Sequence, residues 1–227
     1  TAAAKVLTDF KTARASAGRN ALDAFEKRAL QVLEKMRAGS SHWCKFTQCC
    51  LLLLLSKSLL FVGGAHAASL QWCKHALGVL TSLPVGRGVP SHWTGYFAIL
   101  RAEFLLLSAL IFEQAGDLSH SMAYLVEAAA LGLPSAPPPS SNDTSATDTH
   151  SGGRLLSLGN AVSVQLLIHA YSARTWHRMH NSSRLERSLT KLSAVAASPA
   201  AASRATIVGE LVQWLKWLTT EDHSRSG

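Results

Sequence analysis

The fold of this chain is decided by residues 93–133, which read WTGYFAILRAEFLLLSALIFEQ, then AGD, then LSHSMAYLVEAAALGL. Two apolar runs flank the short break at residues 115–117, which predicts two antiparallel helices joined by a turn. Gly116 suits the left-handed conformation that follows a helix end, and Asp117 or Ser119 can cap the second helix. Small side chains would let the two helices approach closely, and large ones would fill the remaining space; the small ones are Ser108, Ala109, Ser121, Ala123 and Ala128, and the large ones are Leu105, Phe112, Tyr124 and Leu125.

Composition restricts the class of protein. The chain has 227 residues, of which 48% are hydrophobic and 16% charged. It is long enough to bury the core of one or two domains, and too apolar for a disordered protein. Its formal net charge of +8 favours acidic partners such as acidic peptides, anionic lipid surfaces or RNA. The charge indicates the sign of a partner and not its identity.

The cysteines indicate a reducing compartment. They include no Cys-x-x-Cys pair, and a bridge between two adjacent cysteines would be strained; they are Cys44, Cys49, Cys50 and Cys73. With His42, His66 and His75 nearby, a zinc site is one alternative. Small core residues are the favoured interpretation. We therefore predict no metal or other cofactor and a cytoplasmic protein.

Residues 49–62 contain five consecutive leucines and raise the question of a membrane span. A spanning helix needs about 20 mostly apolar residues, and a charge near its centre is strongly disfavoured. Here Ser56-Lys57-Ser58 interrupts the run, and Gly63-Gly64 ends it soon afterwards. A buried helix of a soluble protein is the better interpretation. No signal peptide is recognised in the sequence.

Helical patterns continue on both sides of the central hairpin, so the sequence predicts an all-α fold of about nine helices in a single domain, residues 1–227. Asn20 is expected to cap the second helix, and Asn181-Ser182 the helix before the last. The Pro/Ser/Thr-rich residues 134–153 cannot bury enough apolar surface to fold, which predicts a flexible insertion; a phosphorylated or partner-recruiting segment is the alternative. The other expected helices cover residues 2–16, 41–62, 65–83 and 155–180, with a last one after Ser198-Pro199.

Two hairpins of the chain parallel one another. Leu53 to Ser56 and Ser69 to Cys73, joined through Gly63-Gly64, correspond to the central hairpin 52 residues later. Repeated hairpins bury their apolar faces on one another and build a solenoid. The central hairpin resembles a tetratricopeptide repeat, although Pro134 falls one residue late. The first hairpin departs more, with His75 or Lys57 where small residues are usual. The spacing between the two hairpins also exceeds the family's repeat length of roughly 34 residues. The matching positions are Leu105, Ala109, Phe112, Gly116, Ser121, Leu125 and Ala128.

Residues 60–133 also resemble a Bro domain, the curved helical domain of ALIX-type endosomal-sorting adaptors. Trp93, Arg101 and Phe104 are similar to the family's Trp-led helix, and residues 122–129 are similar to its motif ending Ile-Ala-Arg-Leu-x-x-Ala-Ala. Ser119-His120-Ser121 replaces the family's Gly-Glu-Glu, and its Asn-Asp-x-Ile-Tyr segment is not found. Since a Bro domain contains a tetratricopeptide-like core, both resemblances imply a right-handed solenoid of stacked hairpins. The Bro resemblance also implies an endosomal-sorting partner and a location at endosomal membranes.

The sequence shows no catalytic arrangement, so we expect a protein that is not an enzyme. His177 and His180 are the closest histidine pair, without a carboxylate or cysteine within one helical turn. Neither a Gly-x-Ser-x-Gly nucleophile elbow nor a glycine-rich phosphate loop occurs. Glu103 and Glu127 each stand alone in an apolar run, and are predicted to lie at the polar edge of the central hairpin.

A basic cluster is the candidate surface for a partner. Its members are spaced so that part of the cluster shares one helical stripe; they are Arg174, Arg178, Arg184, Arg187 and Lys191. An acidic or amphipathic helix, or an anionic membrane surface, would fit it, whereas RNA is less favoured because Trp176 is nearly alone as a stacking platform. A merely solvated face is the alternative. Trp217 is either a packing residue or an aromatic anchor for a partner helix.

The predicted function is a non-catalytic protein-binding scaffold that holds a partner's helix or peptide in a groove between helices. The alternative is a basic helical structural subunit of a large ribonucleoprotein or organelle complex.

Overall fold

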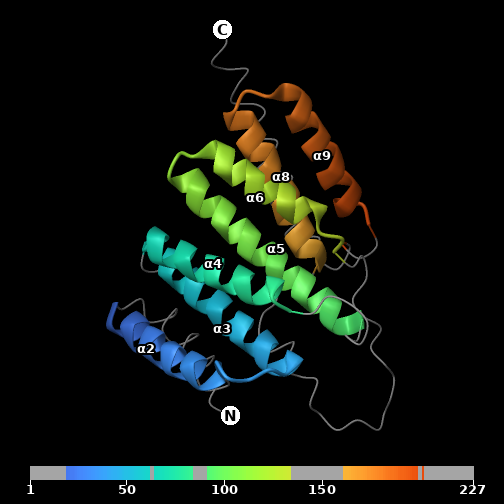
Figure 1. Cartoon of the computed structure of the whole chain (residues 1–227). Helices are drawn as coiled ribbons and strands as arrows, with labels where there is room; N and C mark the ends of the chain where they lie inside the picture. Colours follow the sequence, from blue (N-terminus) through green and yellow to red (C-terminus); the bar gives the residue numbers. More distant parts are fainter. Residues whose placement is uncertain (1–18, 62–63, 84–90, 134–160, 199–200, 202–227) are drawn as a thin grey trace.

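The computed structural model describes residues 19–61, 64–83, 91–133, 161–198 and 201 (Figure 1). Within these residues the chain forms seven α-helices and no strand, which confirms the all-α prediction. The predicted helix 2–16, the insertion 134–153 and the last helix lie outside the described residues. The seven helices are α2 (Arg19–Met36), α3 (His42–Phe61), α4 (His66–Thr81), α5 (Ser91–Gln114), α6 (Leu118–Ala130), α8 (Ala161–Arg178) and α9 (Ser182–Ala196).

The helices pack in chain order. α3 and α4, α5 and α6, and α8 and α9 form three hairpins, and α2 lies against α3 (Figure 1). α5 is the central helix, because it contacts α3 and α4 on one side and α6 and α8 on the other. Its residues Leu100, Phe104, Leu107 and Ile111 join the core formed by α2, α3 and α4. Another set of α5 residues joins a second core with α6 and α8, namely Ile99, Ala102, Leu105, Leu106 and Ala109.

Short turns fix the hairpins as expected. Gly116 has a φ of +82°, which a glycine adopts without the steric penalty of a side chain. The side chain of Asp117 accepts a hydrogen bond from the backbone N–H of His120, and that of Asn181 accepts one from Arg184, so both predicted caps are confirmed. The predicted cap at Asn20 is wrong, because α2 already begins at Arg19 and a capping residue must have a non-helical backbone.

The middle of α3 is mostly apolar around the helix and is buried on nearly all sides. Every residue from Phe46 to Leu60 is buried except Lys57, so the run of leucines forms the buried helix that the sequence predicts. By length and composition, α3 and the Trp93–Gln114 part of α5 are the two helices among the described residues that could cross a membrane. Most of each is buried against other helices of the chain.

The sequence likeness of the first two hairpins includes the starts of α3 and α5. Ser41-His42-Trp43 at the start of α3 recurs as Ser91-His92-Trp93 at the start of α5. The rings of the two segments meet, since the Trp93 ring lies 5.5 Å from that of Phe46 and 6.1 Å from that of Trp43. α3 and α5 therefore begin at the same end of the molecule and run in the same direction (Figure 1).

Candidate partner-binding pocket

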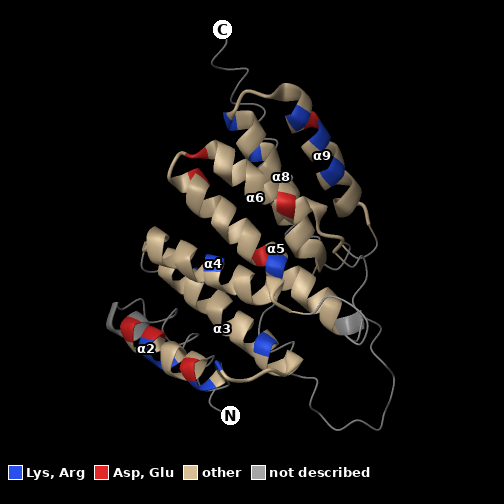
Figure 2. Cartoon of the chain, in the orientation of Figure 1, with Lys and Arg blue, Asp and Glu red and all other residues tan. Residues whose placement is uncertain are grey.

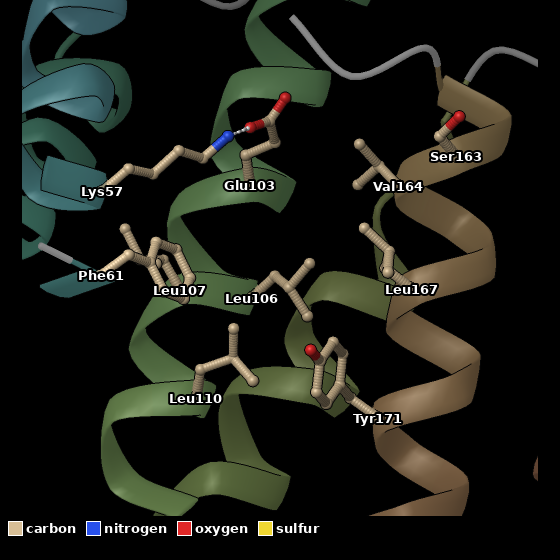
Figure 3. Close-up of a pocket in the computed structure, with 10 residues that line it drawn as sticks. All are labelled: Lys57, Phe61, Glu103, Leu106, Leu107, Leu110, Ser163, Val164, Leu167 and Tyr171. Carbon is tan, nitrogen blue, oxygen red and sulfur yellow. Dashed lines mark hydrogen bonds and ion pairs between the residues drawn. The ribbon is translucent and has the colours of Figure 1, made fainter. Parts of the chain in front are cut away.

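α5 and α8 face each other through two stripes of side chains. Residues three or four apart share a helix face, which places Glu103, Leu106, Leu110 and Glu113 along one side of α5. The opposing stripe of α8 carries Val164, Leu167, Tyr171, Arg174 and Arg178. Between them lies a pocket of about 250 Å³, here called the α5–α8 pocket (Figure 3). It is lined by Lys57, Phe61, Glu103, Leu106, Leu107, Leu110, Ser163, Val164, Leu167 and Tyr171.

The walls of the α5–α8 pocket are apolar. Figure 3 shows Leu167 and Tyr171 of α8 facing Leu106 and Leu110 of α5 across it. Phe61, the last residue of α3, stands at its rim with 63% of its surface exposed. Small-molecule sites usually enclose about 300–1,000 Å³. A pocket of about 250 Å³ is therefore better suited to one or two apolar side chains than to a cofactor.

An ion pair closes one end of the pocket. Nζ of Lys57, from α3, lies 2.5 Å from Oε2 of Glu103, whose side chain is only 6% exposed. The prediction that Glu103 occupies the polar edge of the hairpin is wrong, because α3 brings Lys57 to it in the interior. Glu127 does lie at the surface, where it pairs with Arg101 at 2.8 Å.

A second and larger ion-pair cluster lies one helical turn beyond the pocket. The side chain of Glu113 is 3% exposed, and its Oε1 accepts from Nε of Arg174 at 2.8 Å and from Nη1 of Arg178 at 3.1 Å. The Arg174 guanidinium also lies over the ring of Tyr171, 5.8 Å from its centroid, which links this Glu113 cluster to the pocket. Burial raises the pKa of Tyr171, so its hydroxyl remains protonated and can donate a hydrogen bond at neutral pH.

The structure divides the predicted basic cluster between two helices, α8 and α9. Arg174 and Arg178 lie with Glu113, whereas the other three cations lie on α9. α9 packs through Leu192 against Val162, Leu166, Ala170 and Ala173, a different stripe of α8 from the one that lines the pocket. Arg184 lies 4.6 Å over the ring of Trp176, while Arg187 and Lys191 are exposed.

Charged residues are concentrated on the outer helices α2 and α9, whereas α3 and α4 carry few (Figure 2). Trp217, the remaining predicted contact, lies outside the described residues. Two of the predicted cations therefore contact Glu113, and the other three lie on α9.

Three of the four cysteines belong to the core, and Cys44 is half-buried. Cys49, Cys50 and Cys73 are buried, and burial raises the pKa of Cys49 to about 12 and that of Cys73 to about 11. Such thiols are protonated and poor nucleophiles or metal ligands. No group of three or more His, Cys, Asp or Glu side chains in the described part of the chain is placed to hold a metal ion.

Sequence reasoning missed Lys57 and Glu113 as site residues. One pattern points to Glu113 but not to Lys57: Glu103 and Glu113 are ten residues apart with leucines between them at helical spacing, so both carboxylates share a face with apolar side chains. A carboxylate on an apolar face needs a cation from another segment. Which segment supplies it depends on the packing of α3 and α8 against α5.

No protein-family model, no curated protein and no solved structure matches this chain. The geometry of the α5–α8 pocket and the charges beside it are the features that indicate a function.

Proposed function

We propose that this protein is a non-catalytic interaction scaffold whose α5–α8 pocket binds apolar side chains from an amphipathic helix of a partner protein. The observation that carries the proposal is an apolar pocket at the surface, between two helices, with the exposed ring of Phe61 at its rim. An amphipathic helix docks by inserting residues at i, i+3, i+4 and i+7 into such a site.

The dimensions of the site suit a short helical segment. Glu103 and Glu113 are ten residues apart on α5, which corresponds to about 15 Å along the helix axis. A partner lying over this length would contact it with two to three turns and place one or two apolar anchors in the pocket. A few such anchors usually supply most of the binding energy of an interface.

The arrangement of the helices supports the same class of function. We propose that the three hairpins are part of a right-handed solenoid of about nine helices, as the resemblance to tetratricopeptide repeats and Bro domains implies. Contacts between successive hairpins and the recurrence of Ser-His-Trp at residues 41–43 and 91–93 support this view. In solenoids each unit contacts its neighbours, and extended surfaces between units bind partners.

The proposal is tested by selecting a phage-displayed library of helical peptides on the 227-residue chain. We expect the enriched peptides to carry apolar residues at i, i+3, i+4 and i+7. Their dissociation constants are then measured by fluorescence anisotropy on wild type and two variants. Phe61→Ala removes the apolar surface at the rim and should weaken binding about tenfold, which corresponds to about 1.4 kcal/mol.

Val126→Ala is the matched control, because Val126 is 57% exposed on α6 and does not line the pocket. We expect it to leave the dissociation constant unchanged. Recovery of no apolar pattern, or an equal loss of affinity in both variants, would contradict the proposal.

A further inference from the structure

The cations of α9 form an exposed stripe along one flank of that helix. Arg184, Arg187 and Lys191 are all exposed, and they follow one another at intervals of three and four residues. Such spacing keeps side chains on one side of a helix, and here it covers about 10 Å along the helix axis. Glu186, the one acidic residue of α9, lies at least about 100° around the helix from each of them. These three cations are here called the α9 stripe.

The α9 stripe is unfavourable for the helix taken alone. It places like charges at i, i+3 and at i, i+4, which repel one another. Arg184 also stands in the first turn, where the partial positive charge of the helix end disfavours a cation and where α9 has no acidic residue. None of the three cations forms an ion pair with a carboxylate of the described residues. Departures from local consistency of this kind are expected at functional sites.

α2, the other outer helix on which charges gather, shows the ordinary arrangement (Figure 2). Its charges alternate in sign, since Glu26 precedes Lys27 and Glu34 lies 3.8 Å from Arg37 one turn later. Mixed signs along a helix are typical of a solvated face. The α9 stripe lacks this mixing, so solvation alone does not account for its pattern.

We propose that the α9 stripe binds an acidic helix of a partner protein. The inference goes beyond the proposed function and does not depend on it, because no residue of the stripe lines the α5–α8 pocket. A partner helix rises by the same distance per residue as α9. Glu residues at i, i+4 and i+7 of a helix antiparallel to α9 therefore repeat the spacing of the three cations.

The two ends of the stripe suit carboxylates. The Arg184 guanidinium lies over the Trp176 ring, 4.6 Å from its centroid, and this contact restrains an exposed side chain. A guanidinium presents its N–H donors at its edge, where two of them match the two oxygens of a carboxylate. Lys191 supplies a positive charge at the other end. Its field reaches α8, because burial lowers the pKa of His169 and Lys191 lowers it further.

Two other anionic partners fit the stripe less well. Single-stranded nucleic acid stacks its bases on exposed rings, but α9 has no aromatic residue, and Trp176 is only 8% exposed beneath Arg184. A helix that lies on a membrane surface combines cations with exposed apolar side chains. None of the exposed large apolar side chains of the described residues is on α9. An acidic protein helix requires neither feature.

The test uses fluorescein-labelled helical peptides of about 14 residues, built on alanine and glutamine. One peptide carries Glu at i, i+4 and i+7, a second carries Gln at these positions, and a third carries Glu at i, i+2 and i+4, on different helix faces. By fluorescence anisotropy with the 227-residue chain, we expect the first peptide to bind about tenfold more tightly than either other peptide. Raising the NaCl concentration from about 0.05 to 0.5 M should remove most of this difference. Equal binding of the three peptides would overturn the proposal.

Two double variants assign the contact. Arg187→Gln with Lys191→Gln should abolish the preference for the first peptide. Lys27→Gln with Lys35→Gln removes the same net charge from exposed positions of α2 and should preserve the preference. Circular dichroism checks that both variants are folded. Loss of the preference in both variants, or its survival in the α9 variant, would show that the stripe is not the site.

Further probes separate this surface from other partners and from the pocket. Vesicles of phosphatidylcholine and phosphatidylserine in equal parts, and oligouridine, are measured on wild type and on the α9 variant. If either probe loses more affinity than the first peptide, the stripe serves that partner and the proposal is wrong. Phe61→Ala should leave the affinity for the first peptide unchanged. A loss in Phe61→Ala would place the peptide at the α5–α8 pocket and overturn the assignment to α9.

Discussion

The arginines beside the α5–α8 pocket and the cations of α9 differ in what the fold gives them to contact. Arg174 and Arg178 hold a buried carboxylate that lies 65 residues before Arg178 in the chain, whereas Arg187 and Lys191 are exposed to solvent. In the sequence all of them belong to one basic cluster. The difference shows that sequence spacing determines which residues share a helix face. The segment packed against that face determines whether the charges form buried ion pairs or stay in solvent.

Removing both Arg174 and Arg178 should have the largest effect on the free energy of unfolding. Arg174→Met with Arg178→Met keeps the apolar stems and leaves Glu113 buried without a cation. Breaking a buried ion pair by removing one side of it costs about 3–5 kcal/mol. We expect a loss of this size in the free energy of unfolding, measured by urea denaturation with circular dichroism.

Adding Glu113→Leu to that double variant is the control, because an apolar group of similar size replaces the unpaired charge. Most of the lost stability should return. A double variant less than about 1 kcal/mol weaker than wild type would mean that Glu113 is hydrated, and the contrast with α9 would disappear.

Each single variant should have a smaller effect. In Arg174→Met or Arg178→Met the remaining guanidinium still neutralises Glu113, so the carboxylate keeps a cation although hydrogen bonds to a charged group are lost. We expect about 1.5 kcal/mol for each, because both arginines are partly exposed. The double variant should then exceed the sum of the two singles, and this coupling energy is measured by a double-mutant cycle. If the two losses simply add, the two arginines contribute independently and do not share the neutralisation of Glu113.

The N-terminal cap of α9 should contribute less to the free energy of unfolding than either arginine. The side chain of Asn181 accepts a hydrogen bond from the backbone N–H of Arg184 at 3.1 Å. Asn181→Ala removes this bond and should lower the free energy of unfolding by about 1 kcal/mol. Asn181→Asp retains an acceptor at a helix N-terminus and should be close to wild type. Equal losses in both variants would show that the cap does not depend on this acceptor.

The helical class and the turns between helices could be predicted from local signals, and the pocket could not. Gly116 and Asp117 mark the turn between α5 and α6, and Asn181 the start of α9, because each acts on its own backbone or on residues three positions away. These positions follow from the sequence alone.

Lys57 and Glu103 are 46 residues apart, and their contact exists only because α3 packs against α5. Glu103 was visible as an isolated carboxylate in an apolar run, but its burial depended on a helix that local patterns do not place. The basic cluster cannot be divided from the sequence for the same reason, since the two sides of α8 are distinguished only by what packs on each.

The exposed cations of α9 should contribute almost nothing to stability. Arg187→Met combined with Lys191→Met removes two solvated charges and no buried contact. We expect the free energy of unfolding to change by less than about 0.5 kcal/mol, measured as for the arginines beside the pocket. A loss comparable to that of the Arg174 and Arg178 double variant would show that the two cation sets do not differ.

The smallest expected effect is on the pKa of His169, a residue of α8 that lies near Lys191 of α9. The pKa of His169 on α8 is lowered from its usual value of 6.5, first by burial and then by the positive charge of Lys191. Because the unfolded chain binds this proton more readily, the contribution of His169 to stability is present above about pH 6.5 and is lost as the pH falls. Lys191→Met should raise the pKa of His169 part of the way back, as followed by NMR titration of the ring protons. Arg174→Met, on the other face of α8, is the control and should leave the pKa of His169 unchanged. If the pKa shifts in Arg174→Met and not in Lys191→Met, the positive charge that acts on His169 lies on the pocket side of α8.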